Sequence, residues 1–398
     1  MKKAIRIFLF AAVTLLVITA FVSCKSEKTP ENSASTANIQ TEAEYDFFEN
    51  ESVEILFKDG KFVIKGSFDN SGSQSDEFVV NYTIVKNGTS NKPIEMSKAF
   101  AMQDGTNSFE LSCGVVSKDQ TVKVSVSDKN GEVICEQVEK NIKSLRLLSV
   151  GNSFSVDAQQ WLYGIAKDMG YDNIILGNLY MGGCSLYGHY NSYSNNAEGY
   201  IYYKNTTGTW EETHDVSMLH GLTDESWDYI TLQQASGSSG VSDTYKSHLP
   251  LLVQFVKENA KNGAVEILWH MTWAYSSDST HQDFVKYDND QMKMYESIVN
   301  AVEENVVDSS DISFILPSGT AIQNARATEL GDTLCRDGFH LELGYGRYLA
   351  GLTWIHKITG QPIDDVTYIP DGLFDEETLE ILKKCAKDAV NNPFEVTI

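Results

Sequence analysis

The spacing of apolar residues changes near residue 145, and this change predicts two folded parts. From about residue 44 to 144, short runs rich in β-branched residues alternate apolar with polar positions, which is the pattern of half-buried strands. Turn sequences separate these runs: Lys58-Asp59-Gly60, Lys86-Asn87-Gly88 and Lys129-Asn130-Gly131. Short strands with closely spaced turns predict an all-β, immunoglobulin-like sandwich over residues 44–144.

From residue 145 onward, short apolar runs alternate with stretches of helical periodicity. The runs expected to be buried strands are 145–150, 173–179, 229–233, 265–271 and 312–316. The clearest helical stretches are 161–169, 251–256, 292–302 and 343–358. Strands joined by helices predict a five-stranded parallel sheet covered on both faces, within a domain of residues 145–398. Ligands of such sheets bind at the carboxyl ends of the strands.

The first 23 residues have the features of an export signal. Three cationic residues precede the apolar run 7–22, which is short for a membrane span. The run ends in Phe21-Val22-Ser23-Cys24, which resembles the lipobox of bacterial lipoproteins and implies acylation of Cys24. An ordinary secretory signal is the alternative. Residues 24–43 are polar and predict a flexible tether. We therefore expect an extracytoplasmic protein, anchored to a bacterial membrane at the cell surface or in the periplasm.

Charge and composition limit the partners. The 398 residues include 31 Lys and Arg against 55 Asp and Glu, a net charge of −24. Without residues 1–23 the balance is 28 against 55, or −27. This charge argues against nucleic acid, whose binding requires a basic surface, and it disfavours an anionic lipid surface as ligand. The membrane is expected to be reached only through the lipid anchor. Composition leaves the oligomeric state open.

Five cysteines follow Cys24, so not all of them can pair within the chain. Cys113 and Cys135 fall in one predicted sheet region, and a disulfide between them is one possibility. Cys184, Cys335 and Cys385 are expected to be buried apolar residues. No Cys/His group has the spacing of zinc ligands, and we expect no metal or organic cofactor.

Polar residues follow the first three predicted strands of the α/β part. Gly151-Asn152-Ser153-Phe154-Ser155 lies between a strand and a helix, where a serine hydroxyl is exposed near free backbone N–H groups. Plain helix capping is the alternative. Gly182-Gly183 follows the second strand and either presents an N–H donor or forms a simple turn. Gln233, Gln234 and Ser236 follow the third.

Asp337 and His340 are three residues apart near the C-terminus. This spacing allows one turn to bring a carboxylate to an imidazole, where it fixes the tautomer and stabilises the imidazolium. An exposed serine together with such a pair predicts nucleophilic catalysis.

These motifs resemble the blocks of the SGNH/GDSL hydrolase superfamily, over about residues 145–360. The resemblance implies a three-layer, flavodoxin-like α/β fold with Ser153 as nucleophile, His340 as general base and Asp337 as its orienting carboxylate. The N–H groups of Ser153 and Gly183 would be oxyanion donors, with Gly182 as the alternative to Gly183.

Two departures from the family pattern point to a divergent, largely uncharacterised branch. Asn152 replaces the usual Asp, and both residue types can cap and brace the turn. The Gly-x-Asn-Asp block is missing, and Gln233, Gln234 or Ser236 stands where its Asn donor is expected. The sequence leaves open which of the three faces the oxyanion.

Aromatic residues gather between Tyr187 and Trp210, directly after the glycine turn. Residues 200–203 and 209–212 are predicted to pair as a hairpin, which would serve as a lid or substrate wall or else only pack its own tyrosines. His270 and Trp273 follow the fourth strand and are expected at the same rim, where His270 is either structural or a second base. Tyr187, Trp210, His270 and Trp273 are therefore the candidate substrate contacts.

The leading functional prediction is a serine esterase that acts on an ester-bearing small molecule or acylated glycan. O-acetyl groups on a carbohydrate are the favoured substrate. The alternative is a non-catalytic, glycan- or protein-binding surface lipoprotein on a degenerate hydrolase scaffold.

Overall fold

The computed structural model of the chain describes residues 48–58, 61–86, 92–115 and 119–397. The predicted signal peptide, Cys24 and the tether lie outside these residues, so their assignment stays a prediction, as do the domain boundaries. No helix in the described ranges is both long and apolar enough to cross a bilayer.

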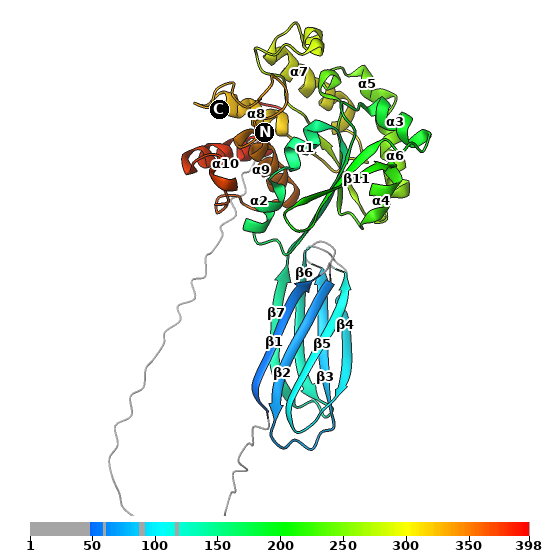
Figure 1. Cartoon of the computed structure of the whole chain (residues 1–398), viewed down its shortest axis with the longest axis vertical. Helices are drawn as coiled ribbons and strands as arrows, with labels where there is room; N and C mark the ends of the chain where they lie inside the picture. Colours follow the sequence, from blue (N-terminus) through cyan, green and yellow to red (C-terminus); the bar gives the residue numbers. More distant parts are fainter. Residues whose placement is uncertain (1–47, 59–60, 87–91, 116–118, 398) are drawn as a thin grey trace, which may run out of the picture. The chain divides into compact units, whose positions relative to one another are not determined.

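The N-terminal part is all-β and consists of two antiparallel sheets (Figure 1), with strand orders β1-β2-β5 and β4-β3-β6-β7. The strands are β1 (Phe48–Lys58), β2 (Lys61–Asn70), β3 (Glu77–Lys86), β4 (Ile94–Ala101), β5 (Gly105–Val115), β6 (Gln120–Asp128) and β7 (Val133–Ile142). Buried Phe62, Phe68 and Phe78 belong to one apolar core. This confirms an N-terminal all-β region, and its immunoglobulin-like topology stays a prediction.

The suggested disulfide between Cys113 and Cys135 is absent. Both thiols are free and buried. Cys113 belongs to β5 and Cys135 to β7, and these strands lie in different sheets. The sequence predicted one sheet region for both cysteines because local patterns do not show which strands belong to which sheet. Burial raises the pKa of both thiols, so they remain protonated and inert.

The second part contains a seven-stranded mixed sheet in the order β11-β10-β9-β8-β12-β13-β14. Its strands are β8 (Ser144–Gly151), β9 (Asn173–Tyr180), β10 (Tyr200–Asn205), β11 (Trp210–Val216), β12 (Tyr229–Leu232), β13 (Glu266–His270) and β14 (Phe314–Leu316). The pairs from β9 to β14 are parallel. β10 and β11 add an antiparallel hairpin to the β9 edge. The predicted five-stranded parallel sheet is therefore corrected to a larger mixed sheet.

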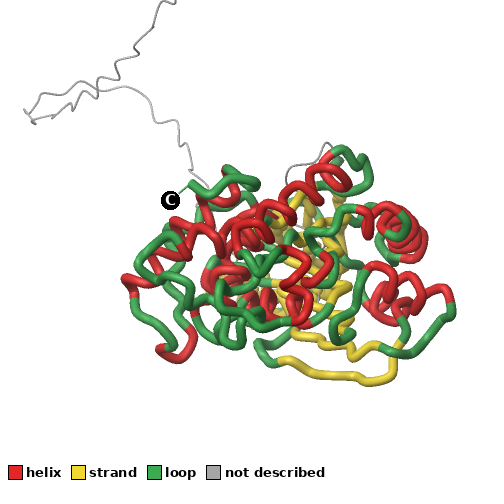
Figure 2. Tube along the Cα trace, turned by 90° about the horizontal axis from the view of Figure 1, so that it is seen from above, coloured by secondary structure: helices red, strands yellow, loops and turns green. Residues whose placement is uncertain are grey.

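Helices pack on both faces of this sheet, and Figure 2 shows them around the central strands when the molecule is seen from above. In Figure 1, α1, α2, α9 and α10 gather on one side of the strands and α3, α4 and α6 on the other. The helices are α1 (Ser153–Gln159), α2 (Leu162–Asp168), α3 (Leu186–Ser194), α4 (Met218–Asp224), α5 (Asp243–Lys246), α6 (Leu249–Asn259), α7 (Gln291–Val302), α8 (Ser318–Arg326), α9 (Tyr345–Thr359) and α10 (Glu376–Asn391).

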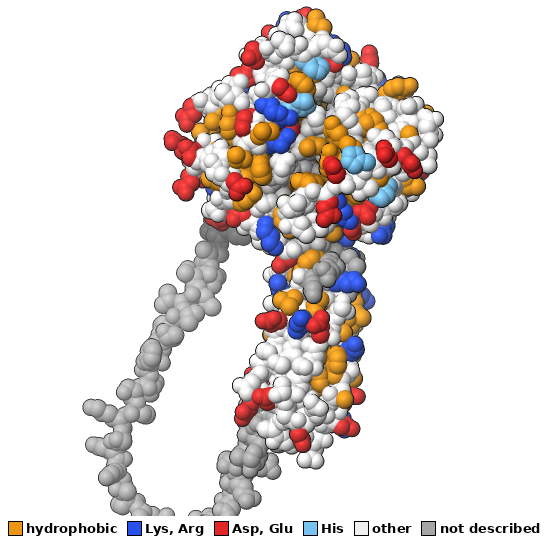
Figure 3. Space-filling model, viewed as in Figure 1, with side chains coloured by type: hydrophobic (Ala, Val, Ile, Leu, Met, Phe, Trp, Pro, Cys, Tyr) orange, Lys and Arg blue, Asp and Glu red, His pale blue; other side chains and the backbone are white. Residues whose placement is uncertain are grey.

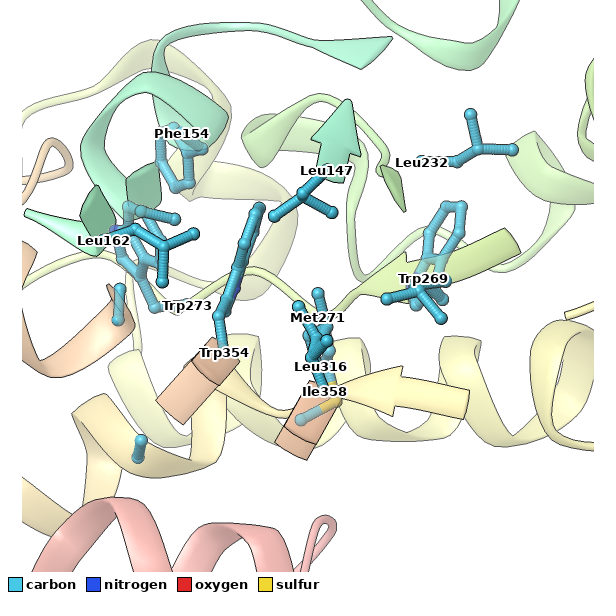
Figure 4. Packing of buried hydrophobic residues seen from close by; sticks show 14 of the residues in the cluster. Leu147, Phe154, Leu162, Leu232, Trp269, Met271, Trp273, Leu316, Trp354 and Ile358 are labelled. Carbon is cyan, nitrogen blue, oxygen red and sulfur yellow. The ribbon is translucent and has the colours of Figure 1, made fainter. Parts of the chain in front are cut away.

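A layer of large apolar side chains supports the start of α1. The rings of Phe154 and Trp273 stack with centroids 4.2 Å apart and an angle of 10° (Figure 4). Both residues are buried, together with Leu147 of β8 and Trp354 of α9. Interiors packed this closely resist small displacements. The backbone of Ser153, the residue before Phe154, is therefore fixed in position by this packing.

Candidate active site

Ser153 is the first residue of α1, directly after β8 ends at Gly151. Asn152 caps the helix, and its Oδ1 accepts the N–H of Phe154 at 3.0 Å. A Cβ at Gly151 would lie 2.5 Å from Ser155 Oγ, so only glycine allows the chain to turn this tightly. The half-buried Ser153 side chain thus lies at the carboxyl end of a central strand, as expected from its sequence position.

Asn152 also links the serine turn to its neighbours on both sides. Its Nδ2 donates to the carbonyl of Cys184 at 3.1 Å, and its Oδ1 accepts from Gln233 Nε2 at 2.8 Å. An aspartate has no N–H to donate, so it could not make the bond to Cys184. The asparagine therefore does more than the expected capping, since it also holds the glycine turn after β9.

His270 continues this buried network and does not reach the rim. Its Nδ1 lies 3.0 Å from Gln233 Oε1, and the side chain is 1% exposed. Because an amide oxygen only accepts, Nδ1 must carry the proton. Burial lowers the pKa of His270 to about 3, so the ring is neutral. His270 is a structural brace, and its expected contact with substrate is corrected.

A tight turn carries the other two predicted residues. It is closed by a bond from Arg336 N–H to the His340 carbonyl at 2.9 Å and by a β-bridge between Cys335 and Leu341. Gly338 adopts a φ of +89°, and a Cβ there would lie 2.9 Å from Ser279 Oγ. These constraints fix the separation of Asp337 and His340 within the turn.

The structure brings Ser153, His340 and Asp337 into one chain of hydrogen bonds. Ser153 Oγ lies 2.8 Å from His340 Nε2, and His340 Nδ1 lies 2.7 Å from Asp337 Oδ2. An ionised carboxylate only accepts, so Nδ1 donates to Asp337 and Nε2 is left to accept the serine proton. Ser153 and His340 are 187 positions apart in the sequence, so their contact depends on the tertiary fold.

Asp337 is held in its ionised form. Partial burial alone would raise its pKa, but hydrogen bonds from the His340 side chain and from the backbone N–H groups of His340 and Phe339 outweigh that effect. The net result is that the pKa of Asp337 lies below its usual value. The two backbone bonds measure 2.8 and 3.2 Å. The carboxylate is therefore charged and correctly oriented at neutral pH.

Asp157 connects α1 to the histidine turn, and sequence reasoning missed it. Its side chain is 1% exposed, and Oδ2 accepts the N–H of Leu341 at 2.9 Å. Oδ1 accepts from Arg347 Nε at 2.8 Å and from Arg336 at 3.4 Å. The one sequence signal for Asp157 was its position four residues after Ser153, which places both side chains on the same face of a helix.

The glycine turn faces solvent beside the serine. Gly182 and Gly183 are exposed, and Gly183 adopts a φ of +60°, which favours glycine. Within the described ranges, neither the Ser153 N–H nor the Gly183 N–H makes a hydrogen bond. Both donors are available to a ligand oxygen.

The three candidates for the missing Asn donor all have other partners. Gln233 and Gln234 are buried, and their Nε2 groups donate to Asn152 at 2.8 Å and to Thr244 at 3.0 Å. Gln234 Oε1 accepts the N–H of Leu186, and this bond fixes the start of α3 just after the glycine turn. Ser236 Oγ lies 2.9 Å from the hydroxyl of Tyr275. The residues thus brace the loops of the site, and a direct bond from either Gln to an oxyanion stays a prediction.

The aromatic candidates divide into exposed and buried residues. Tyr187 is 60% exposed, and Trp210 is half-buried in the wall of a cavity. Trp273 is fully buried and donates its Nε1–H to the Phe339 carbonyl at 2.8 Å. It therefore supports the histidine turn, and its expected contact with substrate is corrected.

The predicted hairpin forms, but as an extension of the sheet. Tyr203 pairs with Glu212 of β11 and with Asn178 of β9. An element held by backbone hydrogen bonds on both sides of β10 is a fixed wall and not a hinged lid.

In the part of the chain that the structure describes, no group of three or more His, Cys, Asp or Glu side chains is placed so that it could hold a metal ion. The site contains a serine hydroxyl, an imidazole, a carboxylate and the two backbone N–H groups of Ser153 and Gly183. This set is suited to acyl transfer.

Comparison with known proteins identifies the family. Residues 146–389 match the family model described as a domain of unknown function, DUF4886. The chain is 41% identical to a DUF4886 protein from Bacteroides uniformis, with a TM-score of 0.62. That match covers 64% of this chain and 98% of the other. The protein therefore belongs to the DUF4886 family. No curated protein matches the chain.

Two more distant structures are carbohydrate-active esterases. A carbohydrate acetylesterase from Xanthomonas citri is 9% identical with a TM-score of 0.32, covering 78% of this chain and 76% of that one. An acetyl xylan esterase from Geobacillus stearothermophilus is 14% identical with a TM-score of 0.35, covering 55% and 96%. TM-scores this low do not establish a shared fold.

Proposed function

We propose that the protein is a serine esterase of SGNH/GDSL type that removes acyl groups, in particular O-acetyl groups, from a carbohydrate. The observation that supports this is the hydrogen-bonded chain Ser153–His340–Asp337, with distances of 2.8 and 2.7 Å. The serine is half-buried at the carboxyl end of β8, beside two N–H groups available to a ligand.

In the proposed reaction, Ser153 Oγ attacks the acyl carbonyl carbon while His340 Nε2 takes the hydroxyl proton. The carbonyl oxygen becomes an oxyanion, which accepts hydrogen bonds from the N–H groups of Ser153 and Gly183. His340 then gives its proton to the leaving alcohol oxygen, and the acyl group stays on the serine. Asp337 stabilises the imidazolium formed in between.

The second half of the reaction repeats these roles with water. His340 takes a proton from water, the resulting hydroxide attacks the acyl carbon, and the proton returns to Ser153 Oγ as the bond to the acyl group breaks. The carboxylic acid leaves and the enzyme is restored. The transfer between Ser153 Oγ and His340 Nε2 takes place between atoms that are already 2.8 Å apart, so it requires no rearrangement of the turn.

The first test is hydrolysis of p-nitrophenyl acetate and butyrate and of acetylated xylan by the purified protein. Ser153→Ala is expected to lower kcat by about 10⁴-fold or more. Ser313→Ala, a change at an exposed position before β14, is the matched control and retains activity. If wild type and Ser153→Ala are equally inert on all three substrates, the protein is a binding scaffold instead.

Anchoring outside the cytoplasm is a separate part of the proposal, based on the sequence of residues 1–24. Membrane fractions of producing cells are expected to contain the wild-type protein. Cys24→Ser is expected to move it into the soluble fraction, because the acylated thiol is lost. Equal membrane retention of both forms would contradict the lipid anchor.

A further inference from the structure

A cavity of about 180 Å³ lies on the sheet beside α1. Its walls come from α1, β9, β10 and β11, and the residues that line it are Val156, Gln160, Asn178, Tyr203 and Trp210. Asn178, Tyr203 and the Asn205–Trp210 pair occupy one face of the sheet, because residues opposite each other in a ladder share a face. The hairpin thus extends the sheet beyond α1 and forms the floor of an open groove.

Tyr180 lies between the groove and the candidate active site. Tyr180 pairs with Gly151 in the parallel ladder and therefore lies level with the serine turn. Its ring centroid is 5.8 Å from that of Tyr203, and a Cβ on Gly182 would lie 3.3 Å from its hydroxyl. A ligand held over Tyr203 and Trp210 would therefore extend past Tyr180 toward the glycine turn.

The same groove is linked to the nucleophile by α1. Val156 follows Ser153 by one helical turn. Ser155 Oγ lies 2.7 Å from the Asn152 carbonyl and 3.0 Å from Asn178 Oδ1. Since Asn178 accepts through Oδ1, the group that remains to face the groove is its Nδ2 donor. The groove therefore combines aromatic faces with at least one amide donor.

The chemistry of the groove favours a neutral, ring-shaped ligand. Half-buried Tyr203 and Trp210 offer apolar ring faces, while amides and a phenol supply hydrogen bonds at the edges. Exposed Glu212 stands directly opposite Tyr203 in the ladder, and its charge disfavours an anionic ligand. Figure 3 shows hydrophobic side chains grouped on the visible face of this part, with scattered acidic side chains that lie mainly toward its edges. A pyranose ring has these properties, because its C–H face is apolar and its rim carries hydroxyls.

We infer that the groove lined by Tyr203 and Trp210 binds a neutral glycosyl unit of the alcohol portion of the ester. The inference rests on the proposed esterase function and specifies its substrate. An extended acyl chain is the weaker candidate, because the groove is open and carries amide groups where an apolar tunnel would be needed.

The test compares two substrates with the full-length protein. The readout is the ratio of kcat/KM on acetylated xylo-oligosaccharides to kcat/KM on p-nitrophenyl acetate, which carries no sugar. Trp210→Ala is expected to lower this ratio about tenfold through loss of the ring face, mainly by raising KM for the oligosaccharide. Trp210→Phe keeps an aromatic face and is expected to restore most of the ratio.

Tyr193→Ala is the matched control, because this aromatic residue of α3 stacks on Phe255 of α6, with ring centroids 4.1 Å apart. Helices α3 and α6 lie on the other side of the sheet from α1, so Tyr193→Ala is expected to leave the ratio of the two kcat/KM values unchanged. An unchanged ratio in Trp210→Ala would overturn the inference. So would a selective loss of p-nitrophenyl hexanoate hydrolysis relative to acetate, which would indicate an acyl site.

If wild type hydrolyses neither ester, the proposed function fails and the groove is judged by binding alone. Calorimetric titration with xylotriose then decides. Binding by wild type that Trp210→Ala weakens about tenfold supports the groove, and absence of binding by wild type overturns it.

Discussion

Asp157→Asn changes one buried carboxylate into an amide of the same shape. Asp157 Oδ1 accepts from Arg347 Nε at 2.8 Å and Nη2 at 2.7 Å, and Oδ2 accepts the Leu341 N–H at 2.9 Å. The single amide oxygen of an asparagine can accept either from Arg347 or from the Leu341 N–H, but not from both. Its NH₂ group then faces the donor that is left. The substitution also leaves the Arg347 and Arg336 guanidiniums without their counter-charge.

The structure sets the expected size of the effect. Breaking a buried ion pair by removing one partner costs about 3–5 kcal/mol. The Asp157 side chain is 1% exposed, but those of Arg347 and Arg336 are 16% and 32% exposed. Arg347 also keeps Gln160 as a partner at 3.2 Å, and Arg336 keeps the Leu341 carbonyl. We therefore expect the lower end, a loss of about 3 kcal/mol in the free energy of unfolding.

Catalysis is expected to suffer separately, because Leu341 is the residue after His340. A loosened Leu341 N–H lets the imidazole drift from Ser153, and small misplacements of catalytic groups cost about ten- to a hundredfold in rate. Asp157 is a positioning residue in this account, so kcat falls while KM for p-nitrophenyl acetate changes little.

Urea denaturation and steady-state kinetics measure the two effects. The control is Asp311→Asn, which removes an ion pair with Lys257 whose side chains are 47% and 51% exposed; it is expected to cost less than about 1 kcal/mol. The reasoning would be refuted by an Asp157→Asn protein that unfolds within about 1 kcal/mol of wild type and keeps full kcat.

Two further predictions concern buried polar groups. Burial lowers the pKa of His189 to about 4 and that of His270 to about 3, so below about pH 6.5 the unfolded chain binds protons that the folded chain excludes. The free energy of unfolding is therefore expected to fall by about 2 kcal/mol from about pH 6.5 to 5.5, about 1 kcal/mol for each histidine. Urea titrations at both pH values measure this loss, and a slope that His189→Gln does not reduce would contradict it. Asn152→Asp replaces the donor to the Cys184 carbonyl with an acceptor and is expected to cost about 1–3 kcal/mol; an unchanged urea midpoint would show that this bond is unimportant.

Much of the architecture was predictable from local patterns. Runs of β-branched and apolar residues separated by helical periodicity indicated β8, β9, β12, β13 and β14, because strand and helix each impose their own repeat on the sequence. The sequence also pointed to the turn that joins Asp337 to His340, because three residues are enough for one turn. It did not indicate that α1 and α2 are separate helices or that Trp161 donates to the Leu343 carbonyl at 2.9 Å, where the periodicity suggested a buried face.

For the site, the sequence alone selected the residues and the tertiary structure decided their surroundings. Ser153 and His340 were named from their positions after a strand and within a motif, and packing across 187 residues brings them to 2.8 Å; their catalytic roles remain a prediction. Only the fold decided that His270 is buried, that Asp157 clamps the histidine turn, and that the aromatic hairpin extends the sheet. The physical reason is that a sequence pattern records which face of an element is apolar, whereas the partner of each polar group depends on which distant elements are packed against it.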